Sequence, residues 1–323
     1  MALSDLAVFS EYAYKAKTEV LRQKIDLFNA ATAGALVLKP AAHQGDFSDE
    51  AFWAKIPGGT TRRRNVYGDS AVSQKTLKHL VDTSVKVAAG TYEFVFDAAW
   101  LTWIQRSPKE AGATFGQQMA VDSMADMLNT GIGLTVAAMA QTTEIVTDVS
   151  GETGDAARYS FRNQNKAVAK FGDAGSQIGV WLSHSTPMYD LFDQNLTNAE
   201  RLFTFGNLNV IRDPFGRLMV MTDSPHLYAS GTGIATSLGL TAGALYVGEN
   251  NDFNANEETR NGKENIETSY QAEWTYNVGV KGYSWDKANG GKSPTDAALF
   301  TSTNWDRYAT SQKDLAGVIL KTK

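Results

Sequence analysis

The sequence contains no cysteine in its 323 residues. Disulfide bonds and thiolate metal sites are therefore excluded, and the fold must be held by packing and non-covalent contacts, which suits folding in a reducing compartment. Histidine is scarce too, and its four residues are dispersed along the chain, at positions 43, 79, 184 and 226. Because no two of them have the spacing of a zinc-binding helix, we predict no metal site and no cofactor.

Long apolar runs and a surplus of positive charge are also missing. No stretch reaches the roughly 20 apolar residues that cross a membrane, and the first residues lack the basic start and apolar run of a signal peptide, so we expect no membrane partner. The net charge is −5. Proteins that coat phosphates usually carry a basic surplus, so this charge does not by itself indicate nucleic-acid binding, although a surface near packed nucleic acid is compatible with it.

Catalytic motifs are nearly absent. Ser183 and Ser185 flank His184 and place hydroxyls beside an imidazole, but neighbouring residues of a strand point to opposite faces and no GxSxG turn surrounds them. We interpret His184 as a loop or capping residue. Gly231 and Gly233 lack the third glycine of a dinucleotide-binding loop. The sequence therefore predicts no catalytic residue and no enzyme activity.

One acidic segment imitates the start of a calcium-binding loop. Asp252, Asn254 and Asn256 have the required alternation, but Glu257 stands where glycine is needed. Lys263 occupies the place of the bidentate glutamate. We reject an EF-hand and leave weak cation binding open.

The sequence does contain one dominant element, the proline-free stretch 114–141, which predicts a single helix of roughly 40 Å. Thr114 is the expected N-cap, and residues 107–110 are expected to form the loop before it. Gly131 and Gly133 each cost about 1 kcal/mol relative to alanine. An apolar stripe predicts a helix that lies across a sheet rather than one buried all round; it comprises Val121, Ala125, Leu128, Ile132, Val136 and Met139.

Residues 4–31 have a sparser helical pattern, with apolar positions too few for a self-sufficient core helix. We interpret this segment as an arm that packs on another surface, such as a neighbouring subunit. An ordinary first helix of the core is the equal alternative.

Residues 43–90 contain two extended segments joined by polar, glycine-containing links, which predicts a long β-hairpin. A two-stranded ribbon is marginally stable alone and needs a partner surface. Arg62, Arg63 and Arg64 lie in its middle. In most proteins such a triplet is a solvated loop, whereas on a projecting ribbon it suits pairing with a neighbour's carboxylates. Phosphate binding is the weaker option, because no glycine-rich loop leads into a helix.

Beyond the long helix, residues 148–155 form a polar joint, and alternating helices and strands follow it. Residues 250–265 are expected to be a polar surface loop. The clearest strand covers residues 270–282, where large apolar and polar residues alternate. Residues 318–320 are expected to form a last short strand.

This order of elements resembles the HK97-like major capsid protein of tailed bacteriophages, over essentially the whole chain. The sequence segments that resemble this family are GATFGQQMAVDSMADML leading into the long helix, VWLSHSTPMYDL, GRLMVMTDSP, and YQAEWTYNVGVKGYSW followed by PTDAAL and NW. The resemblance implies an α+β fold with four parts: an N-terminal arm (1–42), an extended β-hairpin loop (43–90), a peripheral domain (91–150 and 266–323) with spine helix 114–141, and an α/β axial domain (151–265).

The resemblance also implies a structural function without catalysis. Copies of the chain are expected to assemble into pentamers and hexamers of an icosahedral head shell, which encloses double-stranded DNA without sequence-specific binding. The expected partners are a scaffolding protein, a portal and a decoration protein. Because no long extension precedes the arm, the scaffold is expected to be either a separate protein or a short processed segment. The virion is the expected location, after assembly in the host cytoplasm. The residues expected to contact other subunits are Phe9, Tyr12, Phe52, Trp53, Arg62, Arg63 and Arg64.

Three alternatives stay open at this stage. An encapsulin-like cellular compartment would have the same fold and a different cargo. A carbohydrate-active enzyme is suggested by seven Trp and twelve Tyr, which can stack on sugars, and it requires an acid pair in a cleft. A tube or baseplate protein would form rings or tubes instead of closed shells.

Overall fold

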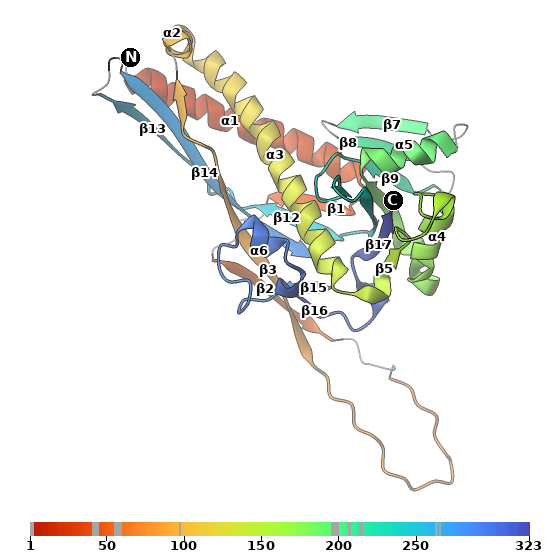
Figure 1. Ribbon diagram of the computed structural model, residues 1–323. Helices are drawn as coiled ribbons and strands as arrows, with labels where there is room; N and C mark the ends of the chain where they lie inside the picture. Colours follow the sequence, from red (N-terminus) through yellow and green to blue (C-terminus); the bar gives the residue numbers. More distant parts are fainter. Residues whose placement is uncertain are drawn as a thin grey trace.

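The computed structural model describes residues 3–40, 45–54, 60–96, 98–194, 200–205, 208–212, 216–261, 264 and 266–323. Over these residues the chain is a mixed α+β fold, as predicted, with two long crossing helices and two separate sheets (Figure 1). The helices are α1 (Leu3–Ala31), α2 (Ala98–Arg106), α3 (Pro108–Ala140), α4 (Phe161–Ala169), α5 (Ser185–Gln194) and α6 (Asp296–Leu299).

The first sheet is built around one long strand, β14, which confirms the strand expected over 270–282. β14 pairs antiparallel with β3 on one side and with β12 and β13 on the other. Its alternating side chains, such as Tyr270, Trp274 and Val278, are buried. The strands of this sheet are β1 (Leu36–Pro40), β2 (Phe47–Trp53), β3 (His79–Gly90), β4 (Phe94–Phe96), β12 (Leu245–Glu249), β13 (Asn254–Arg260), β14 (Glu267–Val280), β15 (Tyr283–Trp285) and β16 (Trp305–Arg307).

The second sheet holds the α/β part of the chain, with α4 and α5 beside it (Figure 1). Its order is β5-β17-β11-β6-β9-β8-β7, with β10 paired to β11. β9 lies between β6 and β8 and is therefore a central strand. The strands are β5 (Val146–Asp148), β6 (Ile178–Ser183), β7 (Glu200–Phe205), β8 (Leu208–Arg212), β9 (Leu218–Met221), β10 (Tyr228–Ala229), β11 (Ile234–Thr241) and β17 (Gly317–Thr322).

Strand pairing corrects two of the expected boundaries. The last strand, β17, was expected in the peripheral part, but it pairs with β11 and β5 of the second sheet, where Ile319 faces Leu238. The polar stretch 250–265 was expected to be a loop, but β13 within it pairs with β14 at seven positions. This edge strand forms through backbone hydrogen bonds to β14. Its side chains are mostly polar and exposed, so its sequence lacks the alternation of apolar and polar residues that predicts a strand.

The long helix α3 also differs from its prediction. It starts at Pro108, a residue suited to the first turn, and Thr114 lies inside it with its hydroxyl donating to the Glu110 carbonyl at 3.0 Å. Val121 of the expected stripe is 44% exposed, whereas most residues from 130 to 139 are buried. The second half of α3 is therefore buried on nearly all sides: Gly131 faces Leu245 of β12, and Gly133 faces Phe300 and His226.

Helix α1 is part of the core, which corrects its interpretation as an arm. Phe9, Leu21 and Phe28 are buried within their own chain. α1 lies along α3 because α3 has glycines, Gly112 and Gly116, at two successive turns where the helices touch. A Cβ atom on Gly112 would lie 2.4 Å from the carbonyl oxygen of Phe9, so only glycine allows this approach. The alternative of an ordinary first helix is the one that the structure shows.

Candidate assembly surfaces

The segment between β2 and β3 projects from the body of the molecule. β2 and β3 pair from Phe47 opposite Val85 to Trp53 opposite His79, which confirms the stem of the predicted hairpin. Beyond this stem, the described residues 60–78 contain no helix or strand and are exposed throughout. Figure 1 shows them as a long loop far from both sheets. We call residues 60–78 the extended loop.

The extended loop has a charge opposite to that of the rest of the chain. It carries three arginines and two lysines against one aspartate, a net charge of +4. The remaining residues therefore carry −9, the difference between −5 and +4. Arg62, Arg63 and Arg64 are all exposed, and so are the apolar side chains of Val66 and Tyr67, at 71% and 97%. Such a segment exposes both charge and apolar area to solvent.

The stem of the loop is fixed to the first sheet by polar contacts. The Thr83 backbone N–H donates to the Ser284 hydroxyl at 3.1 Å. The Lys287 ammonium lies 2.5 Å from the Asp49 carboxylate, and Lys292 lies 3.2 Å from Asp46. The loop therefore leaves the body from an anchored base. Phe52 and Trp53, both expected to contact other subunits, lie in β2, but their side chains lie outside the described residues, so that prediction remains untested.

Two carboxylates face each other across this stem. Glu50 is opposite Asp82 in the register of β2 and β3. The Tyr308 hydroxyl donates to Asp82 at 3.1 Å. Burial raises the pKa of Asp82 to about 6, and the Glu50 charge adds to this effect, while the Tyr308 hydrogen bond opposes it. The stem thus contains a carboxyl group that titrates close to neutral pH.

The two residues of α1 that were expected to contact other subunits have different environments. Phe9 is fully buried and its ring lies 5.6 Å from Phe96 and 5.7 Å from Phe115, centroid to centroid. Its side chain contacts its own chain, which corrects the expectation of an intersubunit contact. Tyr12 is half-buried, with the Lys109 ammonium 5.5 Å from its ring. Its contact with another subunit stays a prediction.

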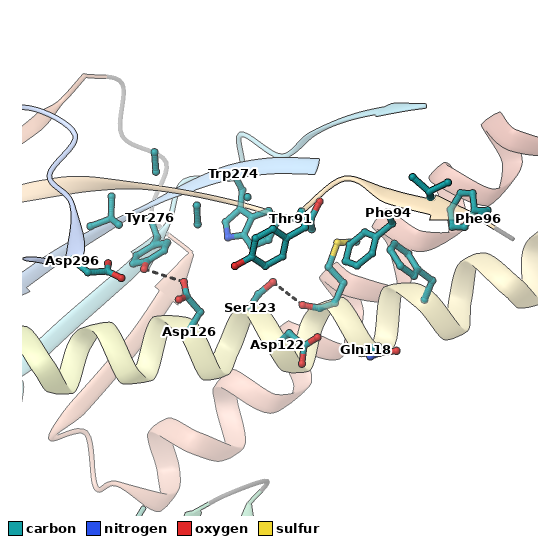
Figure 2. A pocket seen from close by; sticks show the side chains of 18 of the residues that line it. Thr91, Phe94, Phe96, Gln118, Asp122, Ser123, Asp126, Trp274, Tyr276 and Asp296 are labelled. Carbon is teal, nitrogen blue, oxygen red and sulfur yellow. Dashed lines mark hydrogen bonds between the residues drawn. The ribbon is translucent and has the colours of Figure 1, made fainter. Parts of the chain in front are cut away.

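A groove with a volume of about 680 Å³ separates α3 from strands β3, β4 and β14 (Figure 2). Three carboxylates line it: Asp122 and Asp126, one turn apart on α3, and Asp296 of α6. Aromatic side chains, including Phe94 and Trp274, line its strand side. The sequence did not predict this groove. Two aspartates on one face of α3 are typical of an ordinary solvated helix face, and nothing in the sequence indicates that residue 296 lies near them.

Two polar groups of the groove have unusual surroundings. The Asp126 carboxylate accepts a hydrogen bond from the Tyr276 hydroxyl at 3.2 Å. Burial raises the pKa of Asp126, the Tyr276 hydrogen bond lowers it, and the Asp296 charge raises it. The indole N–H of Trp274, a residue only 7% exposed, has no hydrogen-bond partner. Figure 2 shows this nitrogen on the side of the ring that faces α3.

The other candidate motifs take part in local structure. The Thr186 backbone N–H donates to His184 Nδ1 at 3.2 Å, which confirms a capping role for this histidine. Ser183 donates to the Tyr159 hydroxyl at 2.9 Å. Asp252 accepts from the Thr275 backbone N–H at 2.8 Å, so it supports β14.

Neither a metal-binding cluster nor a membrane-spanning helix occurs in the described part of the chain. No group of three or more His, Cys, Asp or Glu side chains there is arranged to hold a metal ion. Within the same residues, none of the helices combines the length and the apolar character that a membrane span needs.

Comparison with known proteins gives one family match. The model of the family described as Gp13-like, major capsid protein 13-like, matches residues 5–319. A search of curated proteins found no match.

Solved structures with a similar chain include phage capsids. The capsid of Ralstonia phage GP4 is 10% identical, with a TM-score of 0.48 over 89% of this chain and 87% of that one. A chain of Mycobacterium phage Adephagia is 11% identical, with a TM-score of 0.47 over 91% and 89%. The head of Helicobacter pylori bacteriophage KHP40 is 11% identical, with a TM-score of 0.46 over 89% and 87%.

Proposed function

The chain belongs to the major capsid protein 13-like family and is a structural protein of the head shell, and from this premise we propose how it builds that shell. Copies associate as pentamers and hexamers, which close into an icosahedral bacteriophage head around double-stranded DNA. The family match over residues 5–319 carries this proposal, since it includes both sheets, the long helices and the extended loop. The role is structural and involves no enzyme activity.

The extended loop supports assembly by contact between unlike surfaces. This segment has a net charge of +4 and exposes Tyr67, so its contact with another surface would remove apolar area from water. If it contacts a different surface of the next copy, the contact is heterologous and can be repeated around a ring. Several such contacts on each subunit act together, so each one can be weak. Arg62, Arg63, Arg64, Phe52, Trp53 and Tyr12 are the proposed contact residues.

The further partners follow from this role. A scaffolding protein and a portal would guide closure, and a decoration protein would bind the finished shell. The DNA would be enclosed without base-specific contacts, in accord with the net charge of −5. The shell would assemble in the host cytoplasm and remain in the virion.

Negative-stain electron microscopy of the purified full-length chain, with light scattering on a sizing column, tests the proposal. We expect closed shells or capsomer-sized rings, alone or with the scaffolding protein added. A chain that stays monomeric at every concentration and with scaffold present would overturn the shell function. Open tubes would indicate another virion component instead.

A further inference from the structure

Helix α4 carries a basic surface on a chain that is otherwise acidic. The segment 156–170, which contains α4, holds four basic residues and no acidic residue, a net charge of +4. The extended loop carries another +4, so the remaining residues carry −13, the difference between −5 and +8. α4 lies beside the second sheet, whereas the extended loop leaves from the first sheet (Figure 1). The chain therefore has two separate basic surfaces.

The outer face of α4 holds two long cationic side chains on a fixed support. Arg162 and Lys166 are both exposed and four residues apart, so they lie on one face of the helix, about 6 Å apart along its axis. The inner face is anchored in the subunit by Asn163, which is buried. The amide nitrogen of this residue donates to the carbonyl oxygens of Ala156 and Arg158 at 2.9 and 2.8 Å.

The two cations of α4 lack a carboxylate partner in the described part of their own chain. Several other surface cations do have one, such as Arg307, whose guanidinium lies 3.1 Å from the Glu144 carboxylate. Neither Arg162 nor Lys166 forms an ion pair with any residue that the structure describes. Their charges are therefore available to an external anion.

The surroundings of α4 also lack the apolar side chains of a protein interface. Over residues 122–188, all of which the structure describes, no large apolar side chain is exposed. Protein interfaces normally have an apolar or aromatic centre, whereas surfaces that bind a nucleic-acid backbone are polar and positively charged. The surface of α4 therefore suits a polyanion better than it suits another subunit.

We propose that Arg162 and Lys166 of α4 contact the phosphates of the enclosed double-stranded DNA, so that this face of the subunit lines the interior of the shell. This inference rests on the proposed shell function and names the surface that meets the DNA. Phosphates follow one another at roughly 3.4 Å along the axis of each strand, so two cations about 6 Å apart can reach alternate phosphates. Contacts of this kind read no base sequence. A chain of negative net charge would thus hold DNA through local positive charge.

Salt-dependent binding to a DNA duplex tests the contact. The full-length chain used for the test has serine in place of the three loop arginines, so that the extended loop does not bind the duplex with them. Arg162→Gln with Lys166→Gln then removes the α4 cations. Arg106→Gln with Lys109→Gln is the matched control, because both residues are exposed and the net charge changes by the same amount. Fluorescence anisotropy of a labelled duplex of about 30 base pairs and mixed sequence measures the affinity at several salt concentrations.

The two pairs of substitutions should differ clearly. The α4 pair should lower the affinity about tenfold at about 50 mM salt, and it should reduce the slope of log affinity against log salt by about 2, one for each lost phosphate contact. The control pair should change the affinity by less than about twofold and leave the slope unchanged. Arg162→Lys with Lys166→Arg keeps both charges and should bind as the starting chain does. Circular dichroism checks that each variant remains folded.

Three results of this experiment would overturn the inference. Equal losses from the α4 pair and the control pair would show that only net charge matters. A starting chain that does not bind the duplex would leave α4 without a phosphate contact. Displacement of the duplex by poly-glutamate as effectively as by an equal charge of unlabelled duplex would show that the site suits an acidic protein surface.

The cysteine-free sequence allows a second test, which determines the side of the shell that α4 faces. Assembled shells of the Lys166→Cys chain are treated with a small maleimide, or with a maleimide on a polymer too large to enter them. We expect only the small reagent to label the shells, whereas unassembled subunits should react with both. Labelling by the large reagent would place α4 on the outside. Failure of both reagents would place it between subunits, and either result would overturn the inference.

The outcomes separate this inference from the shell function. Shells that have α4 on the outside would overturn the inference and leave the shell function in place. A chain that forms no rings or shells, even with scaffold, would overturn the shell function and with it the enclosed DNA as the ligand. A loss of slope from the α4 pair in that same chain would still support phosphate binding by α4.

Discussion

A Cβ atom on Gly116 of α3 would lie 2.2 Å from the carbonyl oxygen of Ala13 in α1. Together with Gly112, one turn earlier, Gly116 lets the two helix backbones approach more closely than any side chain allows. This approach holds α1 against α3 and thereby places Phe9 in the core.

Gly116→Ala should separate the two helices and lower the free energy of unfolding by about 3 kcal/mol, a typical cost of overpacking a tight core. Chemical denaturation of the unassembled subunit measures the effect. Gly179→Ala in β6 is the matched control, because a Cβ atom there meets nothing within 4 Å. It should change stability by less than about 1 kcal/mol. Similar losses at both sites would show that close helix contact is not the cause.

Phe9→Ala tests whether this side chain serves the core or another subunit. The phenyl ring is fully buried among Phe96, Phe115 and Tyr270. Its removal should leave a cavity and cost the isolated subunit about 3–5 kcal/mol, measured by urea denaturation. Tyr12→Ala, at a half-buried position of the same helix, should cost clearly less. If Phe9→Ala left the subunit stable but blocked assembly, an intersubunit role would be correct after all.

Replacement of Arg62, Arg63 and Arg64 together by serine should leave a folded subunit that assembles poorly. The three side chains are exposed, so their loss removes no packing within the chain. Circular dichroism checks the fold, and electron microscopy counts shells. The control replaces the exposed Arg162, Lys166 and Lys323 by serine, which changes the net charge by the same amount at other places. Normal shells from the arginine variant would contradict a contact role for the loop.

Asp82→Asn should make the unfolding stability of the hairpin stem less dependent on pH. The folded-state pKa of Asp82, about 6, is above the ordinary aspartate value of 3.8, so the folded chain binds this proton more tightly than the unfolded chain does. The stabilisation is therefore complete at acidic pH and is lost as pH rises through about 6. Asparagine is uncharged at every pH and can still accept the Tyr308 hydrogen bond.

The asparagine variant should accordingly be more stable than the natural chain at neutral pH and lose this advantage at about pH 4. Urea unfolding at several pH values measures the difference. Asp69→Asn, in the exposed extended loop, is the matched control and should follow the natural chain. An advantage of equal size at all pH values would contradict titration of Asp82 as the cause.

The sequence alone determined the elements whose signals are local. The alternation in β14 and the proline-free run of α3 follow from the repeat distances of strand and helix, so both were predicted. Glycines and polar residues likewise predicted the hairpin stem and its exposed arginines. The absence of cysteine, paired histidines and catalytic motifs is a property of composition and was read directly.

Tertiary structure alone decided which distant segments meet. β13 is a strand because its backbone pairs with the edge of β14. β17 belongs to the second sheet because it pairs with β11. α1 lies in the core because the glycines of α3 allow the two helices to approach closely. The groove depends on the same kind of encounter, since Asp122 and Asp296 meet only when α6 packs near α3. Such contacts depend on the packing of the whole chain. The periodicity of apolar residues in the sequence indicates only which face of one segment is buried, and not which other segment covers it.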